Sequence, residues 1–465
     1  MRRATGYLFS FLAFMSLLAL ACNLSSENAP PTLVPNLPAV TPRATLGYAT
    51  PSSEQLPQVT PGEQVRIEAE LYNLLQQVQS DRLMMHIDAL QSFHTRHVNS
   101  SQTDPNRGIG AAYNYIMGQF EAIQAQAAAN FIVTYQEFDT YFNSIQTVQR
   151  NPIAYIQGTE QEAKTIIIGA HYDSRTWDLN DATSYAPGAD DNGSGVAAVL
   201  ELARILSQRP QRTSVMFVLF ASEEVNRQGS KAFVAQYLRP NNIDIIGMIN
   251  LDTIGSYNTS DGTIHDAEIR LFSDGDATNQ SGSRHLARTI RFIAENQEAV
   301  GLRVNLIPAS DRDGRYGDHF SFAEAGYPAV RFIEAVEDAP NREGADTIEQ
   351  IEPAYLVKTT QTVLAVVVAL SEGPRPPRDT VLREAGSAPD GRPMYNLVWS
   401  HVPGAAGYIV ALRRPGSLVY DQQFSVVENE SGAWERYGEY DGIAVAAVDA
   451  NGMIGPLSEE ITVRR

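Results

Sequence analysis

The chain has 465 residues, more than one typical domain contains, so we expect two folded units with accessory segments. Hydrophobic residues make up 43%, which is enough for a sizeable core, while the formal net charge of -19 argues against nucleic acid as a partner, because phosphate binding needs clustered Lys and Arg. The one cysteine, Cys22, excludes an internal disulfide and a site built from several thiolates. Any bound metal must therefore be held by His, Asp and Glu.

The first 22 residues have the pattern of a signal segment. A positive start at residues 1–3 is followed by an apolar stretch over 7–20 and by small residues before Cys22. The segment resembles a bacterial lipoprotein signal, which implies that Cys22 becomes the lipidated first residue of the mature chain. A plain signal peptide cut after Ala21 is the alternative. Both interpretations predict an extracytoplasmic location, and the first adds a lipid anchor in the cell membrane.

Residues 23–63 form a proline-rich linker. Proline occurs at eight positions between 30 and 61, with Ser, Thr and Asn among them. Such a stretch cannot bury a core, so we expect an extended spacer. Next to a lipid anchor, a spacer would hold the folded part clear of the membrane surface.

Residues 64–373 alternate helical and strand patterns. Apolar residues recur at helix spacing between 64 and 130, with a second helix near 111–128. Residues 363–370 are apolar but too few to span a membrane, and they predict a packing helix that closes the domain. Alternation of apolar strands with helices predicts an α/β fold with a mostly parallel central sheet flanked by helices. The strands are expected at 165–170, 214–221, 245–251 and 329–333, and a helix at 194–207.

The composition changes near 373–378, and a different pattern follows over residues 379–465. This part contains short β-rich runs between Gly, Pro and Asn turns, at 395–399, 408–412 and 443–448. The spacing predicts a small all-β sandwich. On Trp399, Tyr408 and Tyr440 the segment resembles a fibronectin type III domain, and we expect Trp399 and Tyr408 in its core. Spacing, or contact with a protein or polymer, is its predicted role.

Histidine and acidic residues recur where the predicted strands end and where one helix begins. The five groups are His171 with Asp173, Asp190 with Asp191, Glu223 with Glu224, Asp252, and Asp318 with His319 in a loop. Each alone has an ordinary explanation, such as a helix cap, a solvated acidic pair or a structural histidine. Together they match the imidazole and carboxylate set that suits zinc. The carboxyl ends of parallel strands are also where sites form in such sheets.

The spacing within these groups suggests which residues would bind metal and which would act as base or support. Residues two apart in an extended segment share a face, which lets His171 bind a metal while Asp173 supports it. The adjacent pair Glu223-Glu224 suits one metal ligand and one general base. A carboxylate of the pair Asp190-Asp191, where a helix begins, can bridge two cations, and the small residues beside the pair allow close approach of the backbone.

These groups resemble the motifs of the M28 family of metallopeptidases, and the resemblance covers residues 80–372. It implies the zinc-aminopeptidase fold, hydrolysis of N-terminal residues from peptides, and two zinc ions, with cobalt or manganese as substitutes. Asp191 rather than Asp190 would bridge the ions, because the family's bridging Asp stands three residues before a Ser-Gly pair, here Ser194-Gly195. Glu223 would be the general base, and Asp173 would orient His171. The implied metal ligands are His171, Asp191, Glu224, Asp252 and His319.

One departure from the family and three alternatives accompany this prediction. The family often has a His four residues before a late Asp-Thr, whereas Arg342 stands there before Asp346-Thr347. An Arg could bind a carbonyl or carboxylate oxygen and change which substrate end is preferred. A carboxypeptidase or a glutaminyl cyclase of the same fold is the nearer alternative, and a non-catalytic surface binding protein is the alternative of another class. A serine hydrolase is disfavoured, because Ser194 is not in a Gly-x-Ser-x-Gly elbow.

Overall fold

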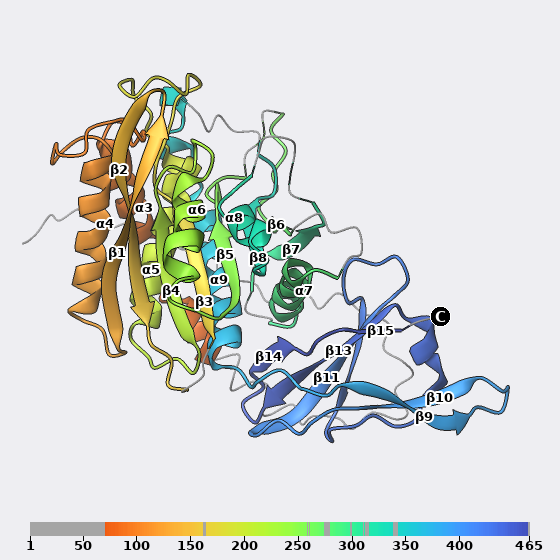
Figure 1. The fold of residues 1–465 in the computed structure, drawn as a ribbon. Helices are drawn as coiled ribbons and strands as arrows, with labels where there is room; N and C mark the ends of the chain where they lie inside the picture. The colour runs from red at the N-terminus through yellow and green to blue at the C-terminus, as the bar shows by residue number, and fades with distance from the viewer. Residues whose placement is uncertain are drawn as a thin grey trace, which may run out of the picture. The chain divides into compact units, whose positions relative to one another are not determined.

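The structure, a computed structural model, describes residues 70–463 apart from short gaps (Figure 1). The gaps are 161–163, 258, 260, 274–279, 298–299, 310, 312–315 and 338–342. The predicted signal segment with Cys22, the linker 23–63 and Arg342 therefore lie outside the described residues. Their assignments stay predictions.

An eight-stranded mixed sheet forms the centre of the larger part of the chain (Figure 1). The strands lie in the order β1-β2-β4-β3-β5-β8-β6-β7. The four central strands, β4, β3, β5 and β8, are parallel, whereas β1 and β2 form an antiparallel hairpin and β6 runs antiparallel to β8. This confirms the predicted α/β fold with a mostly parallel sheet. The strands are β1 (Phe131–Phe142), β2 (Ile145–Ile156), β3 (Thr165–His171), β4 (Ser214–Phe220), β5 (Ile245–Leu251), β6 (Glu268–Phe272), β7 (Arg303–Ile307) and β8 (Ala329–Glu334).

The central strands are apolar throughout because they separate two hydrophobic cores. In β3, Ile166 and Ile168 belong to one core and Ile167 to the other. Successive side chains of a strand point to opposite faces, so a strand covered on both faces shows a continuous apolar run. For this reason β5 has the predicted bounds, and the other three predicted strands differ from them by one residue at the C-terminal end.

Helices cover both faces of the sheet. One face carries α3 (Ser80–Ser92), α4 (Ile109–Gln124), α5 (Gly195–Leu206), α7 (Gly282–Glu295) and α9 (Pro353–Glu372). The other carries α8 (His319–Glu324) and η2 (Phe233–Leu238), which continues the short helix α6 (Gln228–Ala232). The helical pattern predicted from 64 to 130 was wrong for the loop between α3 and α4. That loop contains Pro105, which lacks an N–H, and ends at Gly108, whose φ of 88° no helix accommodates.

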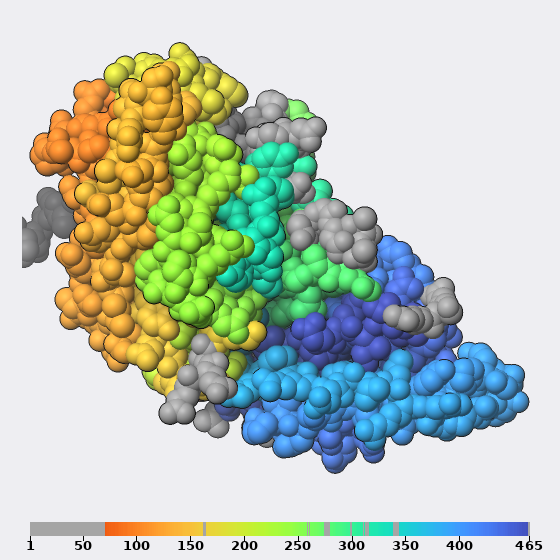
Figure 2. Space-filling view, viewed as in Figure 1, coloured from red at the N-terminus to blue at the C-terminus, as the bar shows by residue number. Residues whose placement is uncertain are grey.

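The β1–β2 hairpin was not predicted. Its twelve-residue strands mix polar and apolar residues, so neither contains a continuous apolar run. Tyr135, Tyr141 and Ile145 are exposed, and the hairpin forms part of the molecular surface (Figure 2). A strand with one solvated face gives a weaker sequence signal than the buried strands beside it.

The long apolar helix α9 belongs to the core. Among the described residues it is the one helix whose length and composition would let it span a membrane, but 89% of its apolar window is buried inside the protein. Val363, Val366 and Leu370 are fully covered by neighbouring elements. The packing helix predicted for residues 363–370 is therefore confirmed.

The last part of the chain folds into two antiparallel sheets, one of two strands and one of five. Trp399 and Tyr408 are buried and meet edge to face, with 5.1 Å between the ring centroids, so the predicted core is confirmed. The resemblance to a fibronectin type III domain stays a prediction. The strands are β9 (Val381–Ser387), β10 (Pro393–Val398), β11 (Ala405–Arg413), β12 (Gln422–Val426), β13 (Gly442–Asp449), β14 (Ile454–Leu457) and β15 (Ile461–Thr462).

Candidate metal centre

Three of the predicted site residues lie at the carboxyl ends of neighbouring parallel strands. His171 is the last residue of β3, Asp252 follows β5 directly, and Glu223 lies three residues after β4 ends. β3 pairs with β4 on one side and with β5 on the other, so the three ends meet at one edge of the sheet. Polar groups can gather there because backbone hydrogen bonding between the strands stops.

Three of the predicted ligands form one compact group. The Nε2 atom of His171 lies 3.1 Å from Oδ1 of Asp191 and 3.7 Å from Oδ1 of Asp252. The candidate ligand atoms of all three residues lie within 4.8 Å of one another, and all three side chains are buried. In the part of the chain that the structure describes, this is the group of histidine and acidic residues with the geometry of a metal site.

Asp173 connects this group to the end of β4. Its Oδ1 lies 3.5 Å from Nδ1 of His171 and accepts the N–H of Glu223 at 3.0 Å, while its Oδ2 accepts the N–H of Glu224 at 3.1 Å. Nδ1 of His171 is also 3.2 Å from the backbone oxygen of Asp173. A carbonyl or carboxylate oxygen at the far nitrogen of a metal-binding imidazole fixes its tautomer and orientation. The same carboxylate here also fixes the backbone that carries the predicted general base.

Glu224 and His319 lie outside the compact group. Oε2 of Glu224 lies 3.4 Å from Nε of Arg175. His319 was predicted in a loop but is the first residue of α8, and neither of its ring nitrogens has a hydrogen-bond partner among the described residues. Burial, aided by Arg331 and Arg227, lowers the pKa of His319 to about 3, so its imidazole is neutral at pH 7.

Burial and neighbouring charges shift the pKa values of the acidic groups around the centre. Burial raises the pKa of Glu223 well above its usual range, and Asp318 and Glu224 raise it further, although His171 opposes them. Burial likewise raises the pKa of Asp318 to about 7. Burial opposes the charged form of His171, but the carboxylates of Asp173 and Asp252 raise its pKa well above the ordinary value. The site therefore strongly favours a positive charge at its centre.

Strained backbone flanks the functional side chains. Ser222, directly before Glu223, has a φ of 60°, and Thr253, directly after Asp252, has a φ of 55°. Non-glycine residues in this region cost about 1–3 kcal/mol each and persist where the surrounding structure holds them. The strained backbone after β4 and β5 therefore fixes the directions of the Glu223 and Asp252 side chains.

Sequence reasoning missed two buried residues that hold the acidic groups. Arg331, in β8, lies 3.6 Å from Oδ2 of Asp252 and 2.6 Å from Asp311. An arginine inside the apolar run of 329–333 was the available signal. Asp346 accepts the backbone N–H groups of Asp190 and Asp191, and the sequence around Asp346 gave no sign of that contact.

Known proteins place the chain in a family. Residues 151–367 match the model of peptidase family M28. A probable zinc metalloprotease of Phaeosphaeria nodorum is 31% identical, over 75% of this chain and 82% of the relative, and one of Pyricularia oryzae is 31% identical, over 77% and 78%. The chain belongs to peptidase family M28. The predicted enzyme class, a metallopeptidase, is thereby confirmed.

Solved structures support the fold of this M28 peptidase. The LapA aminopeptidase of Legionella pneumophila matches with a TM-score of 0.52 at 19% identity, covering 68% of this chain and 77% of its own. The aminopeptidase from Aneurinibacillus sp. strain AM-1 matches with a TM-score of 0.50 at 16% identity, covering 65% and 96%. At these identities the likeness concerns the fold alone.

The compact group of this M28 peptidase fits a zinc ion. Ligand atoms about 2.0–2.2 Å from a tetrahedral zinc ion lie about 3.3 Å from one another. The separations of 3.1 and 3.7 Å between His171 and its two acidic neighbours bracket that value. One imidazole and two carboxylates are also zinc's usual donor types.

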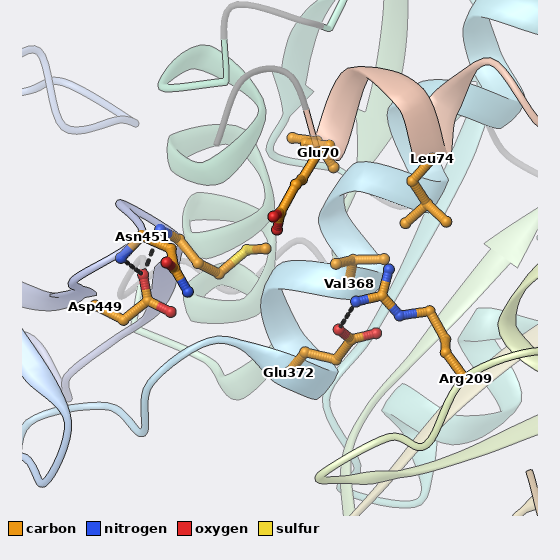
Figure 3. A pocket seen from close by; sticks show the side chains of 9 residues that line it. Glu70, Leu74, Arg209, Val368, Glu372, Asp449 and Asn451 are labelled. Carbon is orange, nitrogen blue, oxygen red and sulfur yellow. Dashed lines mark hydrogen bonds and ion pairs between the residues drawn. The ribbon is translucent and has the colours of Figure 1, made fainter. Parts of the chain in front are cut away.

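A separate cavity of about 150 Å³ lies away from this centre (Figure 3). Arg209 pairs with Glu372 in its wall, and the Asp449 carboxylate accepts the N–H of Asn451 at 2.8 Å. Glu70 also lines it, and no residue of the metal centre does. Because its arginine and two of its acids already have partners within the fold, we assign it no role in the chemistry.

Proposed function

We propose that this M28 enzyme is a zinc-dependent aminopeptidase, which removes N-terminal residues from peptides. The observation that carries the proposal is the buried group of His171, Asp191 and Asp252 at the carboxyl ends of the central strands. Two of the curated relatives are named probable zinc metalloproteases, and two of the solved structures of this fold are named aminopeptidases. These names support the metal and the substrate class.

The compact group would hold one zinc ion, and we propose a second one beside it. The second would use Asp191 as the shared ligand together with Glu224 and His319, and cobalt or manganese suits the same donors. Zinc, when bound, supplies Lewis acidity, which lowers the pKa of water and polarises a carbonyl group. His171 and His319 must be neutral to bind it, and the lowered pKa of His319 meets that condition.

The remaining chemistry belongs to side chains of the chain itself. Glu223 is the proposed general base: it takes a proton from the attacking water and passes it to the leaving amine. Its backbone is held by Asp173, so the carboxylate is positioned by the same residue that orients His171. Burial raises the pKa of the Glu223 carboxylate, which makes it a stronger base than a solvated glutamate and so favours its taking the proton from water.

We further propose that the enzyme works outside the cytoplasm. The support is the apolar segment before Cys22 and the proline-rich linker 23–63, both known from the sequence. Peptides in that compartment would be its substrates, and a lipid on Cys22 would tether it to the membrane.

The test is hydrolysis of free and N-acetylated aminoacyl substrates by the chain from residue 64 onward, with and without a chelator. Chelator-sensitive cleavage of the free-amine substrates alone, lost in Glu223→Ala, is the expected result. Cleavage of the blocked substrates instead would replace the aminopeptidase with a carboxypeptidase-like enzyme. Zinc binding without any cleavage would move the proposal to cyclase activity, measured with N-terminal glutamine peptides.

A further inference from the structure

Asp346 binds the backbone of the pair Asp190-Asp191, in which Asp191 is the proposed shared metal ligand. It lies between the 3-10 turns η3 (Glu343–Ala345) and η4 (Ile348–Gln350) and is buried. Its Oδ1 accepts the N–H of Asp190 at 2.8 Å, and its Oδ2 accepts the N–H of Asp191 at 3.0 Å. Its own backbone oxygen accepts the N–H of Ala189 at 3.1 Å. Three successive residues of the turn before α5 therefore meet one aspartate.

Asp346 repeats an arrangement found on the other side of the centre. Asp173 accepts the two N–H groups of the pair Glu223-Glu224 with its two carboxylate oxygens, at 3.0 and 3.1 Å. Each acidic pair of the site is thus held by one bidentate carboxylate that itself lies outside the metal group. Charge-assisted hydrogen bonds of this kind are shorter and stronger than neutral ones and fix geometry as well as energy.

A buried arginine joins the two arrangements. Arg96 donates to the backbone oxygens of Tyr172 at 2.7 Å and of Gly188 at 2.8 Å, so it ties the end of β3 to the turn that precedes Asp190. Burial lowers the pKa of Arg96 to about 10, while Asp346 and Asp173 oppose that shift, and the guanidinium remains charged at pH 7. Its positive charge offsets the cost of burying two carboxylates nearby.

The turn held by Asp346 needs such a partner. Asp191 and Asn192 have non-helical backbone angles within the segment Ala189–Ser194, so this segment is not a regular helix that would supply partners for its own N–H groups. A buried N–H group without a hydrogen-bond partner destabilises the folded chain. The carboxylate of Asp346 accepts the N–H groups of Asp190 and Asp191 and at the same time fixes the direction in which the Asp191 side chain leaves the backbone.

We infer that Asp346 is a positioning residue, which holds Asp191 in the orientation that completes the group with His171 and Asp252. The inference rests on the proposed metal function and adds a residue to it. An oriented ligand loses little freedom on binding, and partners that orient metal ligands are worth about 10–100-fold in metal affinity. Asp346 would therefore set the affinity of the centre without touching the ion or the substrate.

The experiment measures zinc affinity of the metal-free chain by competition with a chromophoric chelator, below the unfolding temperature. In Asp346→Asn an NH₂ group replaces one acceptor and faces a backbone N–H, so we expect the zinc dissociation constant to rise about 10–100-fold. The value of kcat should fall with little change in KM. Glu201→Gln is the matched control, because the buried Glu201 also accepts a backbone N–H, that of Gln79 at 2.9 Å, away from the site. It should lower the unfolding temperature and leave zinc affinity unchanged.

Asp346→Glu is the second variant. It keeps the charge and both acceptor oxygens but carries them one methylene further, so its zinc affinity should lie between those of the wild type and Asp346→Asn. Wild-type affinity in either folded variant overturns the positioning role, as does an equal loss of affinity in Glu201→Gln. The proposed function is tested separately by zinc binding and peptide hydrolysis of the wild-type chain, so the two can fail independently.

Discussion

Two buried groups of arginines and carboxylates lie in different regions of the molecule and differ in how their charges are arranged. At the contact between α7 and the C-terminal sheets, the Glu460 carboxylate forms ion pairs with Arg413 at 2.8 Å and Arg288 at 3.4 Å. It also accepts a hydrogen bond from the hydroxyl of Tyr420 at 2.8 Å. One carboxylate there meets three donors. At the metal centre, several carboxylates converge on one histidine instead, with Asp191 and Asp252 both near Nε2 of His171.

The difference separates a structural network from a site. A buried carboxylate surrounded by donors is satisfied by the protein and has no capacity left for a ligand. Burial raises the pKa of Glu223 and Asp318, neighbouring carboxylates raise it further, and a bound cation would offset both effects. An excess of buried acidic groups over their donors therefore marks the place where a metal belongs. Four variants test this difference.

The largest effect is expected from Glu223→Gln at the metal centre. The amide cannot accept a proton from water, so turnover should fall by about 10²–10⁴-fold. Zinc content should stay at the wild-type level, because Glu223 is not a proposed ligand. Steady-state kinetics and elemental analysis of the same preparation check both parts. Near-normal turnover would show that another group acts as the base.

The opposite pattern is expected from Glu460→Ala at the C-terminal contact. Removing one member of a buried ion pair leaves Arg288 and Arg413 uncompensated, which costs about 3–5 kcal/mol. Denaturant unfolding should show this loss, while zinc affinity stays unchanged. Glu428→Ala, an exposed glutamate of the same domain, should change stability by less than about 0.5 kcal/mol. A loss of zinc affinity in Glu460→Ala would show that the two networks are coupled.

The same contrast explains how far the sequence could predict this molecule. Continuous apolar runs marked β3 and β5 because both faces of those strands are covered, and the strand-end rule then placed His171 and Asp252 together. The β1–β2 hairpin was not predicted, because its solvated face interrupts the apolar pattern. The end of a buried strand can be predicted from the residues around it, so a single sequence is enough to locate it.

The residues that hold the ligands were beyond such reasoning. Asp346 is 156 residues away from Asp190, and only the folded chain brings them together. Glu224 and His319 were predicted as ligands, but the structure leaves them outside the compact group, so their role depends on the second proposed ion. Contacts between loops depend on the path of the whole chain, which neither periodicity nor motif spacing contains.

A third buried group shows the effect of burial without crowded acids. Burial, with Arg82, lowers the pKa of His86 in α3 to about 4, and its Nδ1 lies 2.8 Å from the hydroxyl of Tyr115. The unfolded chain therefore takes up this proton first, and stability is lost as the pH falls from about 6.5 to about 4. The loss attributable to His86 should be about 3 kcal/mol.

His86→Gln tests this prediction. The amide does not titrate, so the variant should lose about 3 kcal/mol less stability than the wild type between pH 7 and pH 4. Both chains are unfolded by denaturant in the presence of a chelator, so that acid release of metal does not enter the difference. Parallel stability curves over this range would show that His86 is charged in the folded protein.

The smallest effect is expected from Gly317→Ala, which acts on the metal centre through space alone. A Cβ atom at Gly317 would lie 2.7 Å from Cδ of Arg331 and 2.9 Å from Oδ2 of Asp252. Contacts this short force a shift, and the residue displaced is a ligand or the arginine that faces it. Displacing the surroundings of a ligand costs about 10–100-fold in metal affinity, and we expect a loss at the lower end for one methyl group.

Gly118→Ala is the matched control for this methyl group, because Gly118 lies exposed in α4 and a Cβ atom there would meet nothing within 4 Å. Alanine favours a helix over glycine by about 0.8–1.0 kcal/mol, so the control should be more stable than the wild type with unchanged zinc affinity. The same chemical change would then weaken metal binding at one position and stabilise the fold at the other. If Gly317→Ala bound zinc as tightly as the wild type, the loop before α8 would be free to move away from Asp252, and the crowded geometry of the centre would not depend on it.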